Sequence, residues 1–385
     1  MNEYGLLAVS ALRTAIVNGR GRFSPYFESP RGILVVKLDH LGDILLATPA
    51  LRALREARSG IPIDALVLPG SKVLLEGSPL VDRVIAYDSP RFRRGSPSAG
   101  DESGRPGVLR ALSEQQYDWV MELRGDEWTS GPLVRALHPV RRFDRGTVRL
   151  RDSLSRRLDR LLGRGPKPPL HEVETNLSVV REALARPHLD PAVEAPPWPH
   201  ADDELAHAAS VHAPGFDASR PYAVFQVGAS WGPRAWRAER FGAVAAELRA
   251  AYDASIVVLG VAEDSPLRAA YLAGGGPADS SFFFGSLSLP AAGALLRRAR
   301  LFVGSDGGMA HLAAACGTPS VVLFGPQNPA RFRPWGPRII VLHQPVECYP
   351  CAQVVCVRPE NPCVNLNTVE EAVEAAKQLW NSAPA

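Results

Sequence analysis

The feature that most constrains the fold is a pattern that occurs twice, in which short apolar runs alternate with segments of helical periodicity. Residues 31–37 (RGILVVK) have the apolar, β-branched character of a strand buried on both faces. Gly42 and Asp43 then begin a segment whose apolar residues are spaced as on one face of a helix. Further strands are expected at 64–68, 84–87 and 117–123, and a helix at 173–185. Alternation in units of about 30 residues predicts a parallel, doubly wound α/β sheet.

The alternation stops between residues 186 and 221 and then restarts. That interval is rich in proline, alanine and acidic residues and contains no long apolar run, as in a linker. After it, strands are expected at 222–227, 255–259, 301–303 and 320–324, and helices at 241–251, 289–298, 309–316 and 368–380. A length of 385 residues fits two domains. The predicted parts are an N-terminal segment (1–30), two Rossmann-like domains (31–205 and 206–345) and a cysteine-rich segment with a closing helix (346–385).

Charge and hydropathy limit the class of protein and of partner. The formal net charge is only +3 and no run of 18 apolar residues exists, which predicts a cytoplasmic globular enzyme that does not bind nucleic acid. The apolar segment Leu6–Val17 is interrupted by Arg13 and precedes no cleavage site, so it is expected to form an amphipathic helix on a domain or a membrane surface. Residues 135–167 carry ten arginines and one lysine against three aspartates. This stretch is either a solvated face or a surface for a phosphorylated glycan or for the inner membrane, contacted peripherally.

The strongest local signal for chemistry is the segment 303–311 (VGSDGGMAH), which leads from an expected strand into an expected helix. Gly307 and Gly308 let the backbone approach a ligand without a Cβ atom in the way. The free N–H groups and the dipole of the helix start favour phosphate oxygens. The alternative is that Asp306 caps the helix while the glycines only shape the turn. The turn after the first strand contains neither G-x-G-x-x-G nor a P-loop, so no nicotinamide or flavin dinucleotide is predicted.

Two further turns carry candidate residues. Asp43 directly follows the first strand, where a carboxylate can accept the proton of an attacking hydroxyl, although Gly-Asp at a helix start is also an ordinary cap. The segment 228–236 (GASWGPRAW) follows the first strand of the second half. Its small residues and the fixed charge of Arg234 suit a leaving diphosphate, particularly in a reaction without Mg²⁺.

These segments, in this order, resemble the heptosyltransferase family, glycosyltransferase family 9, the ADP-heptose:lipopolysaccharide transferases. The resemblance rests on residues 33–51 and 305–313, followed by 317–319 (GTP) and 324–326 (FGP), and covers most of residues 31–380. It implies a GT-B fold, in which two Rossmann-like domains face a cleft, the first binding the acceptor and the second the nucleotide-sugar. It further implies an inverting transfer of heptose from ADP-heptose to a hydroxyl of a glycan or glycolipid, usually without a catalytic metal.

The resemblance also implies roles for individual residues. Asp43 would be the general base, and His311 a structural hydrogen-bonding partner. Seven residues would bind the donor through its phosphates, sugar, ribose or adenine: Ser230, Arg234, Glu263, Asp306, Gly307, Gly308 and Met309. Glu263 would contact the ribose and Met309 would lie near the adenine. Gly307 departs from the family, which has threonine there, so one hydroxyl that could bond a phosphate is absent.

Four of the five cysteines lie within sixteen residues near the C-terminus: Cys348, Cys351, Cys356 and Cys363. In a reducing compartment such a cluster favours a metal or free thiols over disulfides. The spacing C-x2-C-x4-C-x6-C is close to that of metal ribbons, and some protein-modifying members of the resembled family hold iron through cysteines. Two interpretations stay open, a structural Zn²⁺ or Fe site distant from the reaction and four reduced thiols.

Two other functions remain compatible with the sequence. One is a GT-B transferase that uses another nucleotide-sugar or a protein acceptor. The other is a degenerate sugar-nucleotide-binding protein without turnover. The presence of Asp43 together with Asp306 argues against the second, because a binding protein needs no base.

Overall fold

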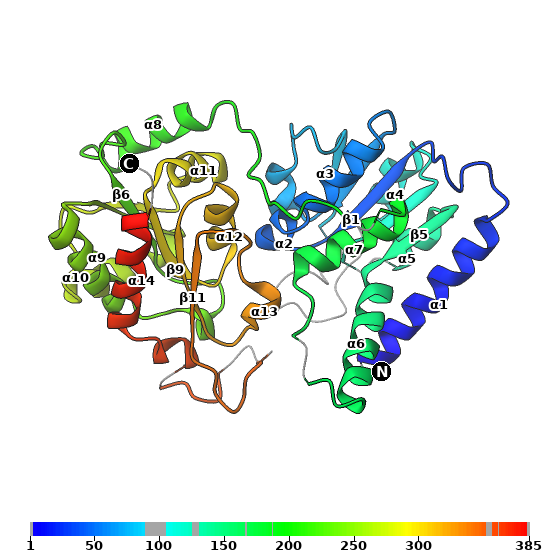
Figure 1. Cartoon of the computed structure of the whole chain (residues 1–385). Coiled ribbons are helices and arrows are strands. Elements are labelled where there is room, and N and C mark those ends of the chain that lie inside the picture. Colours follow the sequence, from blue (N-terminus) through cyan, green and yellow to red (C-terminus); the bar gives the residue numbers. More distant parts are fainter. Residues whose placement is uncertain are drawn as a thin grey trace. The chain divides into compact units, whose positions relative to one another are not determined.

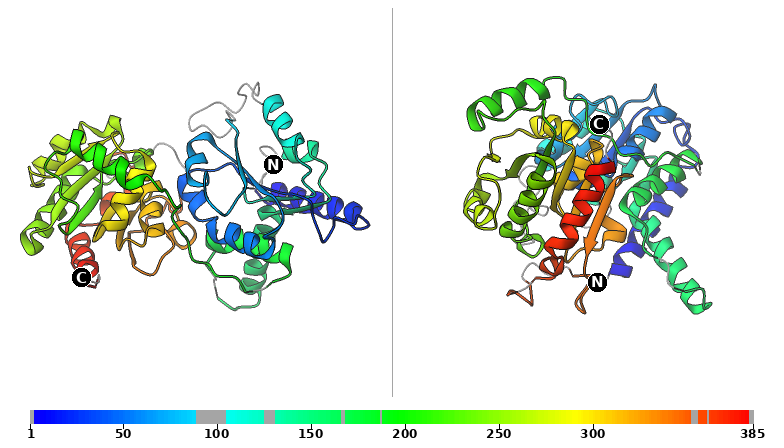
Figure 2. Two further views of the ribbon diagram at one scale, coloured as in Figure 1. Left: turned by 90° about the horizontal axis from the view of Figure 1, so that it is seen from above. Right: turned by 60° about the vertical axis from the view of Figure 1, so that its left-hand side comes forward.

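The computed structural model describes residues 3–88, 105–124, 131–165, 168–186, 188–351, 356–360 and 362–382. The chain divides into two compact units, Met1–Pro196 and Pro197–Ala385. Each unit contains one parallel sheet flanked by helices (Figures 1 and 2), which confirms the predicted α/β class with two doubly wound sheets. The sequence predicted the boundary between residues 205 and 206, whereas the structure places it between residues 196 and 197. The boundary lies earlier because helix α8 (Ala201–His212) packs against α11 (Leu289–Arg298) of the second unit.

The first unit has five parallel strands in the order β3-β2-β1-β4-β5. They are β1 (Ile33–Lys37), β2 (Ile63–Val67), β3 (Arg83–Ala86), β4 (Trp119–Glu122) and β5 (Arg141–Asp144). Its helices are α1 (Glu3–Gly21), α2 (Leu41–Leu45), α3 (Thr48–Ala57), η1 (Pro69–Leu74), α4 (Arg105–Ser113), α5 (Gly131–Ala136), α6 (Arg145–Leu161) and α7 (Glu172–Leu184). The chain runs from β1 outward to β3 and then returns to β4 on the other side of β1. Ligands of open α/β sheets bind at the carboxyl ends beside such a reversal.

The second unit has six parallel strands in the order β11-β10-β9-β6-β7-β8. They are β6 (Tyr222–Gln226), β7 (Ser255–Gly260), β8 (Ser281–Phe284), β9 (Leu301–Ser305), β10 (Ser320–Phe324) and β11 (Ile339–His343). Besides α8 and α11, its helices are η3 (Gly232–Arg234), α9 (Ala238–Tyr252), η4 (Ala262–Asp264), α10 (Leu267–Ala273), α12 (Gly308–Ala315), α13 (Pro329–Phe332), η5 (Cys363–Leu366) and α14 (Val369–Ser382). The reversal here lies between β6 and β9.

The closing helix predicted at residues 368–380 is α14, and it belongs to the core of the second unit. It packs against α9 and β10, and its Trp380 stacks on Tyr252 with ring centroids 5.3 Å apart. The buried side chains of α14 join those of β6, β7, β9 and α9 in one apolar cluster. Burial of this area supplies the main favourable free energy of the unit.

Three strands were not predicted from the sequence: β5, β8 and β11. β8 and β11 are edge strands whose side chains are mostly only half-buried, so they lack the continuous buried pattern of the central strands. β5 begins with two arginines, and Arg142 is nevertheless buried because its Nε lies 2.5 Å from Oε1 of Glu122 on β4. The ion pair of Glu122 and Arg142 allows a strand with a charged side chain to be buried. The sequence pattern does not reveal this pairing, because the two residues are far apart in the chain.

The basic stretch at 135–167 is therefore only partly a surface. Arg142 and Arg145 are buried, and Nη2 of Arg145 lies 2.6 Å from Oε2 of the buried Glu172. Most of the remaining charge lies on α6. The prediction of a single exposed basic face was wrong for these two arginines, because each is neutralised by a buried carboxylate. Within the part of the chain that the structure describes, no helix combines the length and apolar character needed to cross a bilayer.

The ion pair between Glu122 and Arg142 allows a test of the first unit. Replacing Glu122 with alanine leaves the Arg142 guanidinium buried without its carboxylate, so we expect Glu122→Ala to lower the free energy of unfolding of this unit by about 3–5 kcal/mol. Glu114→Ala is the matched control, because its exposed pairing with Arg83 (3.4 Å) should contribute less than about 1 kcal/mol. Urea denaturation measures both, and equal losses would show that Arg142 is not held by Glu122.

Candidate functional site

The candidate donor site lies at the carboxyl edge of the second sheet, beside the reversal between β6 and β9. β6 is hydrogen-bonded to β7 on one side and to β9 on the other, and all three run parallel. The turns that follow them therefore leave the sheet at the same edge. These turns are 227–237 after β6, 261–264 after β7 and 306–308 after β9, and they contain all seven predicted donor residues except Met309, which follows directly.

An ion pair joins the turn after β6 to the turn after β9. Nη1 of Arg234 lies 3.4 Å from Oδ2 of Asp306, whose side chain is buried. The guanidinium also lies over the ring of Trp231, 4.8 Å from its centroid. The backbone N–H of Trp236 donates to Oγ of Ser305 at 3.3 Å. These contacts hold a fixed positive charge beside the first residue of helix α12.

The residues at the start of α12 lie next to the turn that is paired with Arg234, and they include two glycines. Gly307 is the residue before the helix, and Gly308 and Met309 form its first turn. The backbone of Gly307 is extended (φ −178°), and a Cβ atom there would meet only the carbonyl oxygen of Ser305, 3.8 Å away. The position thus has room for the threonine that the resembled family carries. Backbone N–H groups at a helix start favour an anionic group.

A second contact joins the turn after β6 to the turn after β7. Gly228 has φ +78°, a conformation that favours glycine, and a Cβ atom there would collide with the carboxylate of Asp264. Asp264 accepts the backbone N–H of Val261 at 2.9 Å, and its partial burial raises the pKa of this carboxyl group. Asp264 was not predicted as a site residue, although it directly follows the predicted Glu263. Its carboxylate occupies the space that a side chain at position 228 would need.

Two further donor candidates lie in the turns of this edge. Ser230 is exposed in the turn after β6, and Glu263 is exposed in η4 after β7. Both leave the same edge of the sheet as Asp306. His311 is buried in α12, consistent with a structural place in the fold.

In the first unit, Asp43 lies in the first turn of α2, directly after the central strand β1, and is half-buried. This is the carboxyl end of the sheet beside its reversal. Two charged side chains close to Asp43 in the sequence, Lys37 and Asp39, are buried in the first unit. Asp39 forms an ion pair with Arg124, and Nζ of Lys37 lies 3.2 Å from Oδ2 of Asp39. Lys37 also donates to the carbonyl oxygen of Leu123 at 3.1 Å.

The electrostatic surroundings of Lys37 connect it to Asp43. Burial, together with the charges of Arg145 and Arg124, lowers the pKa of Lys37 to about 7, although Asp43 and Glu172 act in the opposite direction. A buried lysine is therefore within electrostatic reach of the predicted base. The sequence places Lys37 at the end of the first strand, but it does not show this electrostatic link, since nothing in a local pattern shows which charges surround a side chain.

The cysteine segment lies close to the donor turns rather than far from them. Helix η5, which begins at Cys363, packs against η3, which ends at Arg234. Nε1 of Trp236 donates to the carbonyl oxygen of Asn367 at 3.1 Å, just beyond η5. The expectation that the cysteines are distant from the chemistry is therefore wrong. It failed because the closing segment folds back onto the turn after β6.

The four cysteines differ in exposure. Cys363 is buried, Cys351 and Cys356 are half-buried, and Cys348 is exposed. Burial raises the pKa of the Cys363 thiol, and the nearby Cys356 and Cys348 raise it further. Within the described residues, no group of three or more His, Cys, Asp or Glu side chains is arranged to hold a metal ion.

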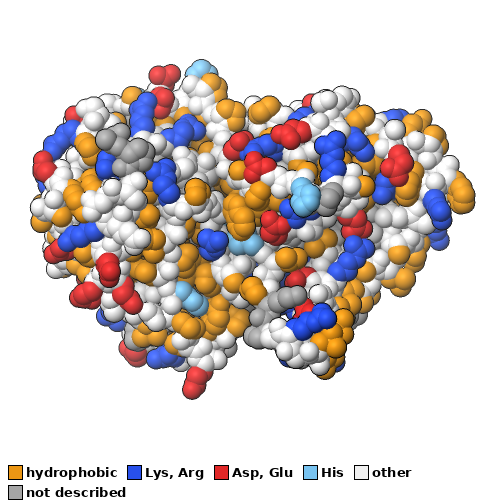
Figure 3. All heavy atoms as spheres, viewed as in Figure 1, with side chains coloured by type: hydrophobic (Ala, Val, Ile, Leu, Met, Phe, Trp, Pro, Cys, Tyr) orange, Lys and Arg blue, Asp and Glu red, His pale blue; other side chains and the backbone are white. Residues whose placement is uncertain are grey.

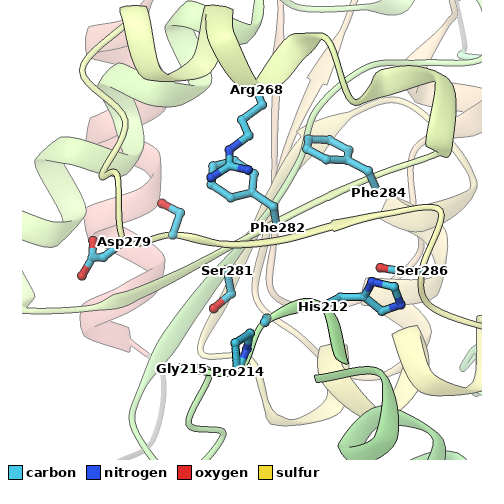
Figure 4. Close-up of a pocket in the computed structure, with 11 residues that line it drawn as sticks. His212, Pro214, Gly215, Arg268, Asp279, Ser281, Phe282, Phe284 and Ser286 are labelled. Atoms are coloured by element: carbon cyan, nitrogen blue, oxygen red, sulfur yellow. The ribbon is translucent and has the colours of Figure 1, made fainter. Parts of the chain in front are cut away.

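The second unit also has an open pocket of about 550 Å³, which is separate from the candidate donor site. It runs along the edge strand β8 and is lined by residues that include His212, Arg268 and Phe282 (Figure 4). Arg268 lies over the ring of Phe282, 4.4 Å from its centroid. None of the predicted donor residues lines this pocket, so we do not assign the donor to it.

Comparison with known proteins identifies the family of this chain. Residues 107–361 match the profile of glycosyltransferase family 9 (heptosyltransferase). The chain belongs to this family. It is 28% identical to lipopolysaccharide heptosyltransferase 1 of Pseudomonas aeruginosa over 330 residues, which are 84% of this chain and 87% of that relative.

Solved structures of this family share the fold. A glycosyltransferase family 9 protein from Veillonella parvula matches with a TM-score of 0.72 and 22% identity, covering 92% of this chain and 98% of its own. The ADP-heptose lipopolysaccharide heptosyltransferase II of Escherichia coli matches with a TM-score of 0.66 and 20% identity, covering 91% and 98%. The predicted GT-B fold and the prediction of a glycosyltransferase enzyme are thereby confirmed.

The close approach of Gly228 and Asp264 allows a test of the donor site. Gly228→Ala adds both a strained φ and a collision with the carboxylate, whereas Gly275→Ala, at φ +89°, adds only the strain because nothing lies within 4 Å. We expect Gly275→Ala to cost about 1–2 kcal/mol of stability and Gly228→Ala about 1–3 kcal/mol more. Only Gly228→Ala should also weaken nucleotide binding in calorimetry, because its turn leads to Arg234. Equal effects of the two substitutions would show that the close approach of Asp264 to Gly228 has no consequence for the site.

Proposed function

We propose that this glycosyltransferase transfers heptose from ADP-heptose to a hydroxyl of a lipopolysaccharide-core glycan or related glycolipid in the cytoplasm, with inversion at the anomeric carbon. The observation that carries the proposal is the ion pair of Arg234 and Asp306 beside the start of α12, at the reversal of the second sheet. Membership of the heptosyltransferase family and the printed activities of the relatives support the choice of sugar and acceptor.

The second unit supplies what a leaving diphosphate requires. Negative charge develops on the phosphate as the bond to the anomeric carbon breaks. Arg234 and the backbone N–H groups at the start of α12 would stabilise that charge without reorganising during the reaction. Asp306 holds Arg234 in place and leaves its carboxylate near the sugar, where it accepts hydrogen bonds from hydroxyl groups. The mechanism thus uses a fixed side-chain cation where other transferases use a metal.

The first unit supplies the base. Asp43 would accept the proton of the acceptor hydroxyl while the oxygen attacks the face of the sugar opposite to the diphosphate, which inverts the centre. Its position after β1, at the reversal of the first sheet, is where an open α/β sheet binds a ligand. Lys37 and Asp39 are buried in the same unit and form an ion pair, and the charge of Lys37 interacts with that of Asp43.

The test combines donor selectivity with removal of the base. Calorimetry of ADP, ADP-heptose, UDP-hexoses and GDP-hexoses should show selective binding of the two adenine nucleotides. Asp43→Asn should bind ADP-heptose as the wild type does but should lose about 10²- to 10⁴-fold in turnover, because only the proton transfer is removed.

The matched control is Asp203→Asn, which removes an exposed carboxylate from α8 and should change neither quantity. Preference for a uridine or guanosine donor would keep the fold but overturn the heptose assignment. Normal turnover of Asp43→Asn would remove Asp43 from the mechanism.

For the cysteine segment, we propose that Cys348, Cys351, Cys356 and Cys363 hold a structural Zn²⁺ or Fe ion. Support comes from their spacing and from the electrostatic proximity of Cys348 and Cys356 to Cys363. Since no described group is arranged to hold an ion, the segment would have to draw together on loading. An ion there would fix η5 against η3 and so stabilise the turn that carries Arg234.

Metal analysis of protein purified without added metal tests this proposal. We expect about one ion per chain, held by four thiolates, and its loss together with reduced thermal stability in Cys363→Ser. Cys316→Ser is the control, because Cys316 lies outside the segment, next to the carbonyl oxygen of Gly293 at 3.6 Å, and should retain the ion. A metal content far below one ion in the wild type would leave the cysteines as reduced thiols.

A further inference from the structure

Exposed apolar side chains are concentrated on two helices of the first unit. The described residues include ten large hydrophobic side chains that are exposed, and seven of them lie on α1, on α6 or directly after these helices: Leu12, Ile16, Phe23, Leu154, Leu158, Leu161 and Leu162. Phe23 is 91% exposed and Leu161 is 76% exposed. Isolated exposed leucines are ordinary, but a concentration of this kind marks a surface that contacts something else.

Helix α1 turns its polar face toward the protein and its apolar face away from it. Thr14 donates to Oδ2 of the buried Asp144. Asn18, one turn later, donates to the carbonyl oxygen of Arg142 at 3.0 Å and accepts its backbone N–H at 2.8 Å. The helix therefore covers the open edge of β5 through hydrogen bonds. Leu12 and Ile16, one turn apart on the other side of the helix, point outward.

Helix α6 carries a similar apolar stripe bordered by arginines. Leu154, Leu158 and Leu162 follow each other at intervals of four residues, which places them on one face. Arg157 borders this face and Arg160 lies further round the helix on the same side as Arg157. Both are exposed and form no ion pair with the described residues. Asp159, in contrast, is buried, so its charge does not offset the arginines at the surface. The outer face of α6 is thus both apolar and positively charged.

The two helices pack against each other, so their exposed stripes belong to one region of the surface (Figure 1). At the lower right of Figure 3, where Figure 1 places the end of α6, hydrophobic side chains gather with Lys and Arg side chains beside them. We call this region the α1–α6 surface and define it by the seven hydrophobic residues given above, together with Arg157 and Arg160.

We propose that the α1–α6 surface docks onto an anionic phospholipid bilayer, with the leucines among the acyl chains near the headgroups and the arginines at the phosphates. Basic side chains beside an apolar stripe are the pattern of helices that lie in the membrane interface. Arginine can keep its guanidinium at the headgroups while its stem lies along apolar surface. A second copy of this chain fits less well, because α6 against α6 would bring arginines of like charge together.

Vesicle co-sedimentation of the whole protein tests the proposal without donor or acceptor, so its result is independent of the proposed reaction. We expect binding to vesicles of phosphatidylcholine mixed with phosphatidylglycerol, weak binding to phosphatidylcholine alone, and a decrease as salt is raised. Arg157→Gln combined with Arg160→Gln should lower the affinity for the mixed vesicles about tenfold or more, since each basic residue near an anionic surface contributes. Leu154→Gln combined with Leu158→Gln should lower it by a similar factor.

Matched substitutions elsewhere serve as controls. Val211→Gln removes an exposed hydrophobic side chain from α8, and Arg110→Gln removes an exposed arginine from α4. Neither should change vesicle binding, and all variants should keep the wild-type affinity for ADP, which shows that they are folded.

Three results would overturn the proposal. They are failure of the wild type to bind the mixed vesicles, equal binding by the α6 variants, and a dimer in analytical ultracentrifugation that Leu154→Gln with Leu158→Gln abolishes. The last result would assign the surface to a second copy of this chain.

Discussion

The pairing of β6 with both β7 and β9 is the constraint on which the donor half of this protein depends. Parallel hydrogen bonding forces the three strands to end at one edge, and the reversal of strand order leaves room there between the crossover helices. Gly228 and Asp264, from two of these turns, come close only because of this arrangement. Arg234 and Asp306, which are 72 positions apart in the sequence, then form the ion pair that joins two turns. The first sheet repeats the principle with β1 and β4, which places Asp43 at an equivalent edge.

Charge serves two different purposes in this chain, and burial decides which. In the interior, Arg142 pairs with Glu122, Arg145 with Glu172, and Lys37 with Asp39. Each pair offsets the high cost of removing an ion from water. The charges of Arg145, Glu172 and Asp43 also act on Lys37. On α6 the arginines stay in water beside leucines. The same basic stretch of sequence therefore contributes both to the interior of the first unit and to the α1–α6 surface.

The closing segment links the cysteines to the donor site. Trp236 is buried against it and donates to Asn367, and Arg240 donates to the carbonyl oxygens of Asn365 and Asn367 at 2.6 and 2.9 Å. The segment thus holds the end of the turn that contains Arg234. Anything that orders or loosens this segment acts on a neighbour of the proposed leaving-group site. Helix α14 completes the arrangement by burying Trp380 in the core of the same unit.

The sequence by itself determined the class of fold, the central strands and the turns that carry the site, because apolar periodicity and glycine turns are local signals. Asp43, Arg234 and the segment 306–309 could be selected on that basis together with the family motifs. Tertiary structure alone decided the edge strand β5, the support that Asp264 gives to Gly228, and the position of the cysteines beside η3. It also decided that Thr14 and Asn18 of α1 face inward while Leu12 and Ile16 face outward. These facts depend on contacts between residues far apart in the chain, and no local pattern records which distant group will compensate a buried charge or cover a polar strand edge.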